Sequence, residues 1–338
     1  MNRLARVLTF LWLRRLPVWV SALAFVLSGC AMLAAWVDPL PRFDAQAHRG
    51  GRGLSPENTL TAFRSAMTLG VTTLETDLAM TRDGVLVLAH DPYLNPALVR
   101  APDGRWLTVK GPAIFTLSHD ELMKFDIGRL NPDDKYSQNF PLQQPADGER
   151  FASLAQLFAL VKASGKNYRV NLETKITPNA PDKTVSPERF AGALVDAVRT
   201  AGFERQTSIQ SFDWRTLLAV KRIAPAIRTV CLSIDSPGMS TISKDPGRAS
   251  DWHAGLKLAD YGGVMPAMVK AAGCEVWSMF WRNLSAQDFA QAKSYGLSVI
   301  PWTVNEVADM QALIALGVDG LITDYPDRLM SVLKSRTQ

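Results

Sequence analysis

The 338-residue chain has little cysteine, little histidine and, over most of its length, almost no net charge. It contains three cysteines, of which only Cys231 and Cys274 lie beyond the N-terminal segment. Two cysteines cannot build a disulfide framework, so that class of small stapled domain is excluded. Each stands in an apolar run typical of a strand. We expect buried free thiols here, with a single bridge as the alternative.

The net charge of +5 comes mainly from the N-terminus. Four of the 37 basic residues and none of the 32 acidic residues lie in residues 1–37, which leaves 33 basic against 32 acidic residues from Asp38 onward. A domain with this balance lacks the basic surface that contact with a phosphate backbone requires. We therefore expect no nucleic-acid partner.

The basic N-terminus leads into an apolar segment, residues 16–37. Basic residues, an apolar run and then Leu-Ser-Gly-Cys at 27–30 resemble a bacterial lipoprotein signal, in which Cys30 becomes lipidated. We favour a signal segment over residues 1–29, with an uncleaved membrane-spanning helix over 16–37 as the alternative. The arginines before the segment indicate that the following domain lies outside the cytoplasm, on the periplasmic side, and is anchored to the membrane.

After a linker over residues 38–42, short apolar runs alternate with helical patterns. The expected strands are 45–48, 73–79, 168–173, 207–210, 228–233, 275–279, 298–302 and 320–323, and the helices between them include 59–69, 154–163, 187–200, 213–223, 286–295 and 307–316. Repeated strand–helix units require a parallel sheet. Eight of them fit an α/β fold of the (β/α)8 TIM-barrel type over residues 43–333. No glycine-rich nucleotide loop follows any strand, which weakens the open-sheet alternative.

Residues 92–150 interrupt this alternation with turn-rich Asn-Pro, Pro-Asp-Gly and Asn-Pro-Asp-Asp segments. We interpret them as a subdomain inserted after the second strand region. It would project from the face on which barrel active sites lie, and could cap or shape a substrate pocket.

Two carboxylates, Glu75 and Asp77, lie two positions apart in the second expected strand and therefore share one face. At one end of a barrel they would raise each other's pKa unless a cation lay between them. A hard divalent ion is the simplest such cation. The alternative is that both face solvent on a half-exposed strand.

Other titratable residues end strands or follow them. His48 ends the first expected strand, and His90 follows a hairpin-like return with Asp91 beside it to orient the ring. Glu173 ends the next barrel strand, and Lys175 shares its face. Each has an ordinary alternative, as a structural histidine, a solvent-exposed loop histidine or a surface ion pair.

All these residues lie at the carboxyl ends of the first three barrel strands or on the return after the second. Three carboxylates there suit Ca²⁺ or Mg²⁺, and two histidines supply an acid and a base. Arg49 and Lys175 add the positive charge that an anionic phosphate ester needs. Residues 55–60 need no catalytic role, because Asn58 or Thr59 is explained as a helix N-cap.

The motifs that hold these residues resemble those of the glycerophosphodiester phosphodiesterase family over about residues 43–333. The resemblance lies in His48-Arg49-Gly50 with Pro56-Glu57-Asn58-Thr59, Glu75-Thr76-Asp77 with His90-Asp91-Pro92, Asn171-Leu172-Glu173-Thr174-Lys175, Gln210-Ser211-Phe212-Asp213, Pro301-Trp302-Thr303-Val304-Asn305 and Thr323-Asp324-Tyr325-Pro326. It implies a TIM barrel that uses a divalent metal to hydrolyse glycerophosphodiesters to glycerol 3-phosphate and an alcohol.

The resemblance also implies a role for each residue. His48 and His90 would be the acid–base pair, Glu75, Asp77 and Glu173 the ligands of Ca²⁺ or Mg²⁺, and Arg49 and Lys175 the phosphate contacts. Ser211 and Trp302 are weaker candidates for lining the pocket, with packing in the barrel as the alternative. Two rival functions remain, a barrel phospholipase acting on lysolipid or sphingolipid head groups and a catalytically silent module that binds polyol phosphates.

Overall fold

The computed structural model describes residues 41–180 and 182–336. The signal segment, Cys30 and the alternative helix over 16–37 lie outside these residues. Among the described residues, no helix has both the length and the apolar character needed to cross a membrane.

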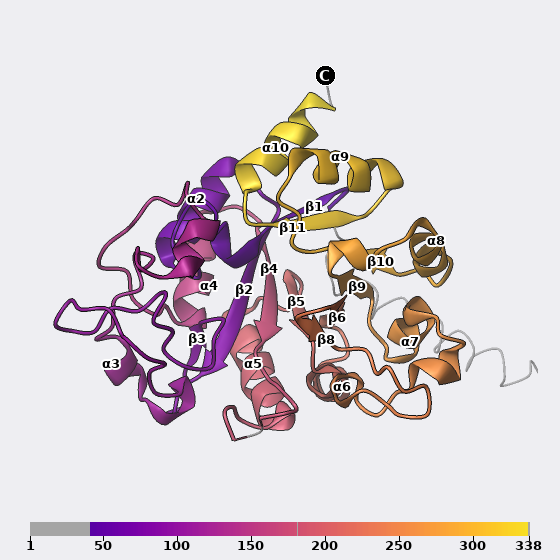
Figure 1. Cartoon of the computed structure of the whole chain (residues 1–338), viewed down its shortest axis with the longest axis horizontal. Coiled ribbons are helices and arrows are strands. Elements are labelled where there is room, and N and C mark those ends of the chain that lie inside the picture. Colours follow the sequence, from indigo (N-terminus) through magenta and orange to yellow (C-terminus); the bar gives the residue numbers. More distant parts are fainter. Residues whose placement is uncertain (1–40, 181, 337–338) are drawn as a thin grey trace, which may run out of the picture. The chain divides into compact units, whose positions relative to one another are not determined.

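Eight parallel strands form a nearly closed barrel, in agreement with the predicted fold (Figure 1). They are β1 (Asp44–Ala47), β2 (Thr73–Met80), β4 (Arg169–Thr174), β5 (Thr207–Ser211), β6 (Arg228–Ser233), β9 (Val276–Met279), β10 (Ser298–Val299) and β11 (Gly320–Thr323). The order β10-β9-β6-β5-β4-β2-β1-β11 leaves β10 and β11 at the two ends. These ends meet where the N–H groups of Asp319 and Ile322 donate to the carbonyls of Val299 and Pro301, at 2.9 and 3.0 Å.

Helices follow the strands and cover the outside of the barrel. They are α2 (Leu60–Leu69), α4 (Leu154–Ala163), α5 (Pro187–Ala201), α6 (Trp214–Ile223), α7 (Met265–Ala271), α8 (Ala286–Ser294), α9 (Val307–Leu316) and α10 (Pro326–Ser335). Thr59, Ser153 and Ser285 cap three of them by accepting backbone N–H bonds, as their position before an apolar run predicts. The bounds of six of these helices were predicted from the sequence to within two residues. No range was predicted for α7 or α10.

The strands are buried on both faces, but the two faces differ. In β2 and β4 the outward side chains Leu74 and Leu172 join the main apolar core under the helices, whereas Glu75 and Asn171, which are register partners, point into the barrel. Inside the barrel, Asn171 donates to Gln46 and to Gln210, both at 2.9 Å, and Gln210 donates to Glu75 at 2.7 Å. The interior on this side is therefore a hydrogen-bonded polar layer.

The predicted insertion, residues 92–150, follows the short strand β3 (Leu86–Leu88), which pairs antiparallel with β2. It contains the short helix α3 (His119–Leu122) and many turns. Its apolar side chains form a separate small core with the end of β2 and with β3, made of Ala79, Val87, Ala89, Leu94, Val99, Ile114, Leu122, Ile127 and Phe151. The insertion is thus packed against the second and third strands.

The expectation of free thiols at Cys231 and Cys274 is wrong, because the structure joins them in a disulfide with a Cα–Cα distance of 5.9 Å. Cys231 lies in β6 and Cys274 just before β9. These two strands pair directly, although the hairpin β7 (Asp235–Ser236) and β8 (Met239–Ser240) lies between them in the chain. The sequence separation of 43 residues concealed that adjacency.

Candidate active site

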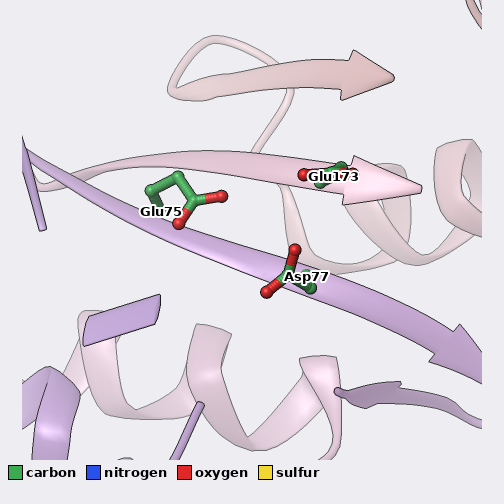
Figure 2. Close-up of side chains that lie close together, drawn as sticks. All are labelled: Glu75, Asp77 and Glu173. Carbon is green, nitrogen blue, oxygen red and sulfur yellow. The ribbon is translucent and has the colours of Figure 1, made fainter. Parts of the chain in front are cut away.

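Three buried carboxylates meet inside the barrel, Glu75 and Asp77 from the first part and middle of β2 and Glu173 from near the carboxyl end of β4 (Figure 2). Glu75 and Asp77 project from the same face of β2, and Asp77 is the register partner of Glu173 on β4. Each offers one oxygen that lies within 4.8 Å of the oxygens of the other two. The structure therefore brings together the three acids predicted as metal ligands.

The protonation of this cluster reflects its burial. Desolvation, followed by the charge of Asp77, raises the pKa of Glu75 well above its usual range. Desolvation also raises the pKa of Glu173 to about 7, against the opposing effect of Lys175. For Asp77, desolvation alone would raise the pKa, but the charges of Arg49, His90 and Lys175 together lower it. Burial therefore favours the protonated form of Glu75 and Glu173.

The cluster fits a divalent cation. Asp77 Oδ1 is buried and accepts no hydrogen bond, whereas its Oδ2 accepts one from Asn58 Nδ2 at 3.2 Å. A buried carboxylate oxygen that accepts no hydrogen bond is costly, and a metal ion would satisfy it. An all-oxygen set of three carboxylates is the ligand chemistry that Ca²⁺ and Mg²⁺ prefer.

His48 lies at the end of β1 and is held by a carboxylate. Its Nδ1 is 2.6 Å from Asp324 Oδ1, and because a carboxylate only accepts, Nδ1 carries the proton and Nε2 is left as an acceptor. Asp324 also accepts from Arg52 Nε at 2.7 Å and from Asn305 Nδ2 at 2.8 Å. Burial and the charge of Arg52 lower the pKa of His48 to about 4, so the ring is neutral near pH 7.

His90 follows β3 and is more exposed, with 32% of its side chain accessible. Its Nδ1 lies 3.2 Å from Asp91 Oδ1, so Asp91 is placed to orient the ring as the sequence predicted. Burial, then the charges of Arg49 and Lys175, lower the pKa of His90. His48 precedes Arg49, whose backbone N–H donates to Glu75, and a positive charge on His90 would lower the pKa of Asp77.

Arg49 and Lys175 supply the positive charge of the site. The backbone N–H of Arg49 donates to Glu75 at 2.8 Å, and its guanidinium contacts Glu57 at 2.8 Å and Asp77 at 3.1 Å. Lys175 Nζ lies 2.6 Å from Glu173 and 3.7 Å from Asp77. Both cations therefore offset part of the negative charge of the three carboxylates.

The two weaker candidates lie in different surroundings. Ser211 is fully buried, and its hydroxyl accepts from Thr174 at 3.0 Å and from the N–H of Asp213 at 3.1 Å, which favours a packing role. Trp302 is half-buried and contacts Phe212 edge-on at 5.5 Å, and its Nε1 has no hydrogen-bond partner. Phe212 in turn lies 5.9 Å from Lys175 Nζ, so the Trp302 side chain stands next to the site.

Sequence reasoning missed several residues that hold the site together. Thr59 is the N-cap of α2, as the sequence indicated, and the neighbouring Glu57 and Asn58 contact Arg49 and Asp77. Residues 55–60, for which no catalytic role was predicted, therefore help to hold the site in place. Asp324 follows β11 directly, and the strand-end position that singled out Glu173 could have identified it. Arg52 and Tyr136 could not be identified from the sequence pattern, because neither stands at the end of an expected strand.

The barrel, its cluster of buried acids and the paired histidines define a class of protein, the (β/α)8-barrel hydrolases that act on phosphate esters. Within that class, the model of the glycerophosphoryl diester phosphodiesterase family matches residues 48–328, so the chain belongs to this family. It is an enzyme, a phosphoric diester hydrolase.

Individual relatives agree with this assignment. A glycerophosphodiester phosphodiesterase of Caldanaerobacter subterraneus subsp. tengcongensis is 30% identical over 292 residues, covering 85% of this chain and 96% of the relative. A crystal structure of a Silicibacter pomeroyi protein assigned to the same activity is 30% identical, with a TM-score of 0.76 over 89% of this chain and 95% of that one. An Oleispira antarctica phosphodiesterase in complex with the product sn-glycerol-3-phosphate has a TM-score of 0.63 over 87% of this chain and 97% of that one; at 22% identity it shows the fold alone.

Proposed function

We propose that the enzyme hydrolyses glycerophosphodiesters to glycerol 3-phosphate and an alcohol, with Glu75, Asp77 and Glu173 holding one Ca²⁺ or Mg²⁺ ion and His48 and His90 serving as the acid–base pair. The observation that carries the proposal is the buried acidic cluster, in which Asp77 Oδ1 accepts no hydrogen bond. The two histidines support it, because each is held by a carboxylate of its own, His48 by Asp324 and His90 by Asp91.

The side chains of the site divide the work. Arg49 and Lys175 bind the phosphate oxygens and orient the phosphorus for in-line attack. One imidazole takes the proton of the attacking hydroxyl at its Nε2, while the other donates a proton to the departing alkoxide oxygen. The metal ion, when bound, neutralises phosphate charge and makes phosphorus more electrophilic.

The test is turnover of purified enzyme on glycerophosphocholine and glycerophosphoethanolamine after chelation with EDTA, with Ca²⁺ or Mg²⁺ added back separately. We expect activity to vanish with EDTA and return with one ion, and glycerol 3-phosphate to appear in equal amount to the free alcohol. A lysophosphatidylcholine arm tests the rival phospholipase. Turnover of that lipid alone, or binding of glycerol phosphate without turnover of any diester, would overturn the proposal.

We also propose that the catalytic domain is anchored to the membrane on the periplasmic side, through a lipidated Cys30 in preference to an uncleaved helix. The Cys231–Cys274 disulfide supports an extracytoplasmic location, because such bonds persist in oxidising compartments. Mass spectrometry of the protein from membranes tests the anchor. A diacylated N-terminal cysteine at position 30 is expected, whereas an unmodified chain that retains Met1 contradicts the lipoprotein.

A further inference from the structure

Both histidines are backed by a carboxylate, and each carboxylate is tied to the insertion, residues 92–150. On the His90 side the link is direct, because Asn95 Nδ2 donates to Asp91 Oδ2 at 2.6 Å while Asp91 Oδ1 faces His90 Nδ1. On the His48 side the link passes through one arginine. Arg52 Nε donates to Asp324 Oδ1, the oxygen that faces His48, and its Nη1 donates to the Tyr136 hydroxyl at 3.0 Å.

The Tyr136 hydroxyl has a second bond that leads to the metal ligands. It donates to Glu57 Oε2 at 2.5 Å, and Glu57 Oε1 accepts from Arg49 Nη1 at 2.8 Å. Arg49 Nε in turn lies 3.1 Å from Asp77 Oδ2. One hydroxyl of the insertion therefore stands between the group that holds His48 and the group that holds Asp77.

Other contacts from the same part of the insertion fix Arg52 in place. The Phe140 ring lies under its guanidinium at 4.9 Å, and Gln143 Nε2 donates to its backbone carbonyl at 2.7 Å. Tyr136 and Phe140 also pack edge-on at 5.2 Å. Residues 136–143 thus contact Arg52 at its backbone, its planar face and its Nη1, which leaves the guanidinium little freedom to turn away from Asp324.

We propose that Tyr136 is a positioning residue for His48, so that the insertion sets the geometry of the catalytic centre as well as standing beside it. The proposal rests on the proposed function and assigns Tyr136 no contact with substrate. A hydroxyl that accepts from one buried charged group and donates to another is hard to replace, because its loss leaves both partners unsatisfied. The apolar packing of the ring would survive that loss.

Four charged groups surround His48: Arg49 next to it in the chain, Arg52 after the turn, Asp324 at the end of β11, and Asp77 on β2. In Tyr136→Phe, Arg52 loses the hydrogen bond from its Nη1 to the Tyr136 hydroxyl, so its guanidinium is freer to rotate away from Asp324. Its charge then opposes protonation of His48 less, so the pKa of His48 rises from about 4. The neutral imidazole of His48 also loses its fixed orientation, and this slows the chemical step.

The experiment compares Tyr136→Phe with Tyr168→Phe. Tyr168 is buried at the start of β4, at the opposite end of the barrel, and donates one hydrogen bond to the Met67 carbonyl at 2.8 Å. Both variants lose one hydroxyl, but only one lies in the network. We expect Tyr136→Phe to lower kcat about 10- to 100-fold with KM nearly unchanged. In a plot of kcat/KM against pH, the acid limb should shift to higher pH. Tyr168→Phe should stay close to wild type in both measurements.

Two further measurements keep the outcome decisive. NMR titration of the imidazole C–H signals reports the pKa of His48 without turnover, and Arg52→Lys keeps the charge but cannot bond Asp324 and Tyr136 together. Tyr136→Phe should raise the pKa of His48, whereas Arg52→Lys, which retains the positive charge, should lower kcat without that rise. If the wild-type enzyme were inactive on every diester, the proposed function would be wrong. The positioning role of Tyr136 would still be tested by the NMR titration, which needs no turnover. If Tyr136→Phe matches Tyr168→Phe in kcat, pH profile and titration, the positioning role is wrong.

Discussion

One half of the barrel interior is polar and the other half is aliphatic. On β1, β2, β4 and β5 the inward residues Gln46, Glu75, Asn171 and Gln210 bond to one another in a chain. At β6, β9, β11 and just after β10 the corresponding positions are Val230, Val276, Ile322 and Ile300, which form a small separate apolar cluster.

The difference shows how a barrel can hold several buried charges and remain folded. Buried carboxylates cost free energy unless they are paired, so the polar half contributes chemistry at the expense of stability. The aliphatic half removes apolar area from water and is joined outside by the Cys231–Cys274 bridge. We therefore expect changes in the polar half to affect turnover, and changes in the other half to affect unfolding.

The strongest test of this division removes each site histidine. His48→Ala and His90→Ala should each lower kcat about 10²- to 10⁴-fold, because the acid or base of the reaction is lost. Neither side chain belongs to an apolar cluster, so thermal unfolding should change little. His119→Ala, in α3 of the insertion, is the matched control. Steady-state kinetics with near-normal turnover in both site variants would contradict the assignment.

The next test weakens the aliphatic half by removing its disulfide. Reduction, or the Cys231→Ala/Cys274→Ala pair, should lower the free energy of unfolding by about 2–4 kcal/mol, because the unfolded chain loses a cross-link. The kcat of the folded enzyme should stay the same. Urea unfolding curves with and without dithiothreitol measure the effect. Superimposable curves would show that the bond contributes nothing.

The sequence predicted much of this architecture because strand period and strand ends are local signals. Glu75 and Asp77 lie two positions apart in one expected strand, and Glu173 ends the next, so their common location follows from the parallel order of the strands. The partners that complete the site come from far away in the chain: Asp324 lies 276 residues from His48, and Tyr136 lies 84 residues from Arg52. No period links such pairs, since loop conformation decides whether they meet.

The carboxylates of the polar half should also make the affinity for the metal ion depend steeply on pH. Burial raises the pKa of Glu75 strongly and that of Glu173 to about 7, so binding of the proposed metal ion would displace protons from these carboxyl groups. Apparent affinity should fall by about tenfold per pH unit for each proton displaced as the pH drops from 8 to 6. Calorimetric titration of the chelator-treated enzyme with Ca²⁺ and with Mg²⁺ at several pH values measures this affinity. An affinity independent of pH would mean that the carboxylates are already ionised.

The smallest effect concerns His253, a buried histidine whose ring packs on that of Trp214, with centroids 4.3 Å apart and an angle of 32° between the planes. Burial lowers its pKa to about 4, and, unlike His48, it forms no ion pair with a carboxylate among the residues that the structure describes. Because the folded protein resists protonation here, stability is full above the unfolded pKa of about 6.5 and is lost as the pH falls toward 4.

His253→Phe keeps a stacked ring without the titrating nitrogen. Between pH 7.5 and pH 5 the variant should lose about 2 kcal/mol less unfolding free energy than the wild type, with kcat unchanged at both pH values. The difference in slope is the measurement, since an added ring atom shifts the absolute stability equally at each pH. Equal slopes in urea unfolding at the two pH values would show that His253 accepts a proton in the folded state, and the contrast with His48 would then rest on activity alone.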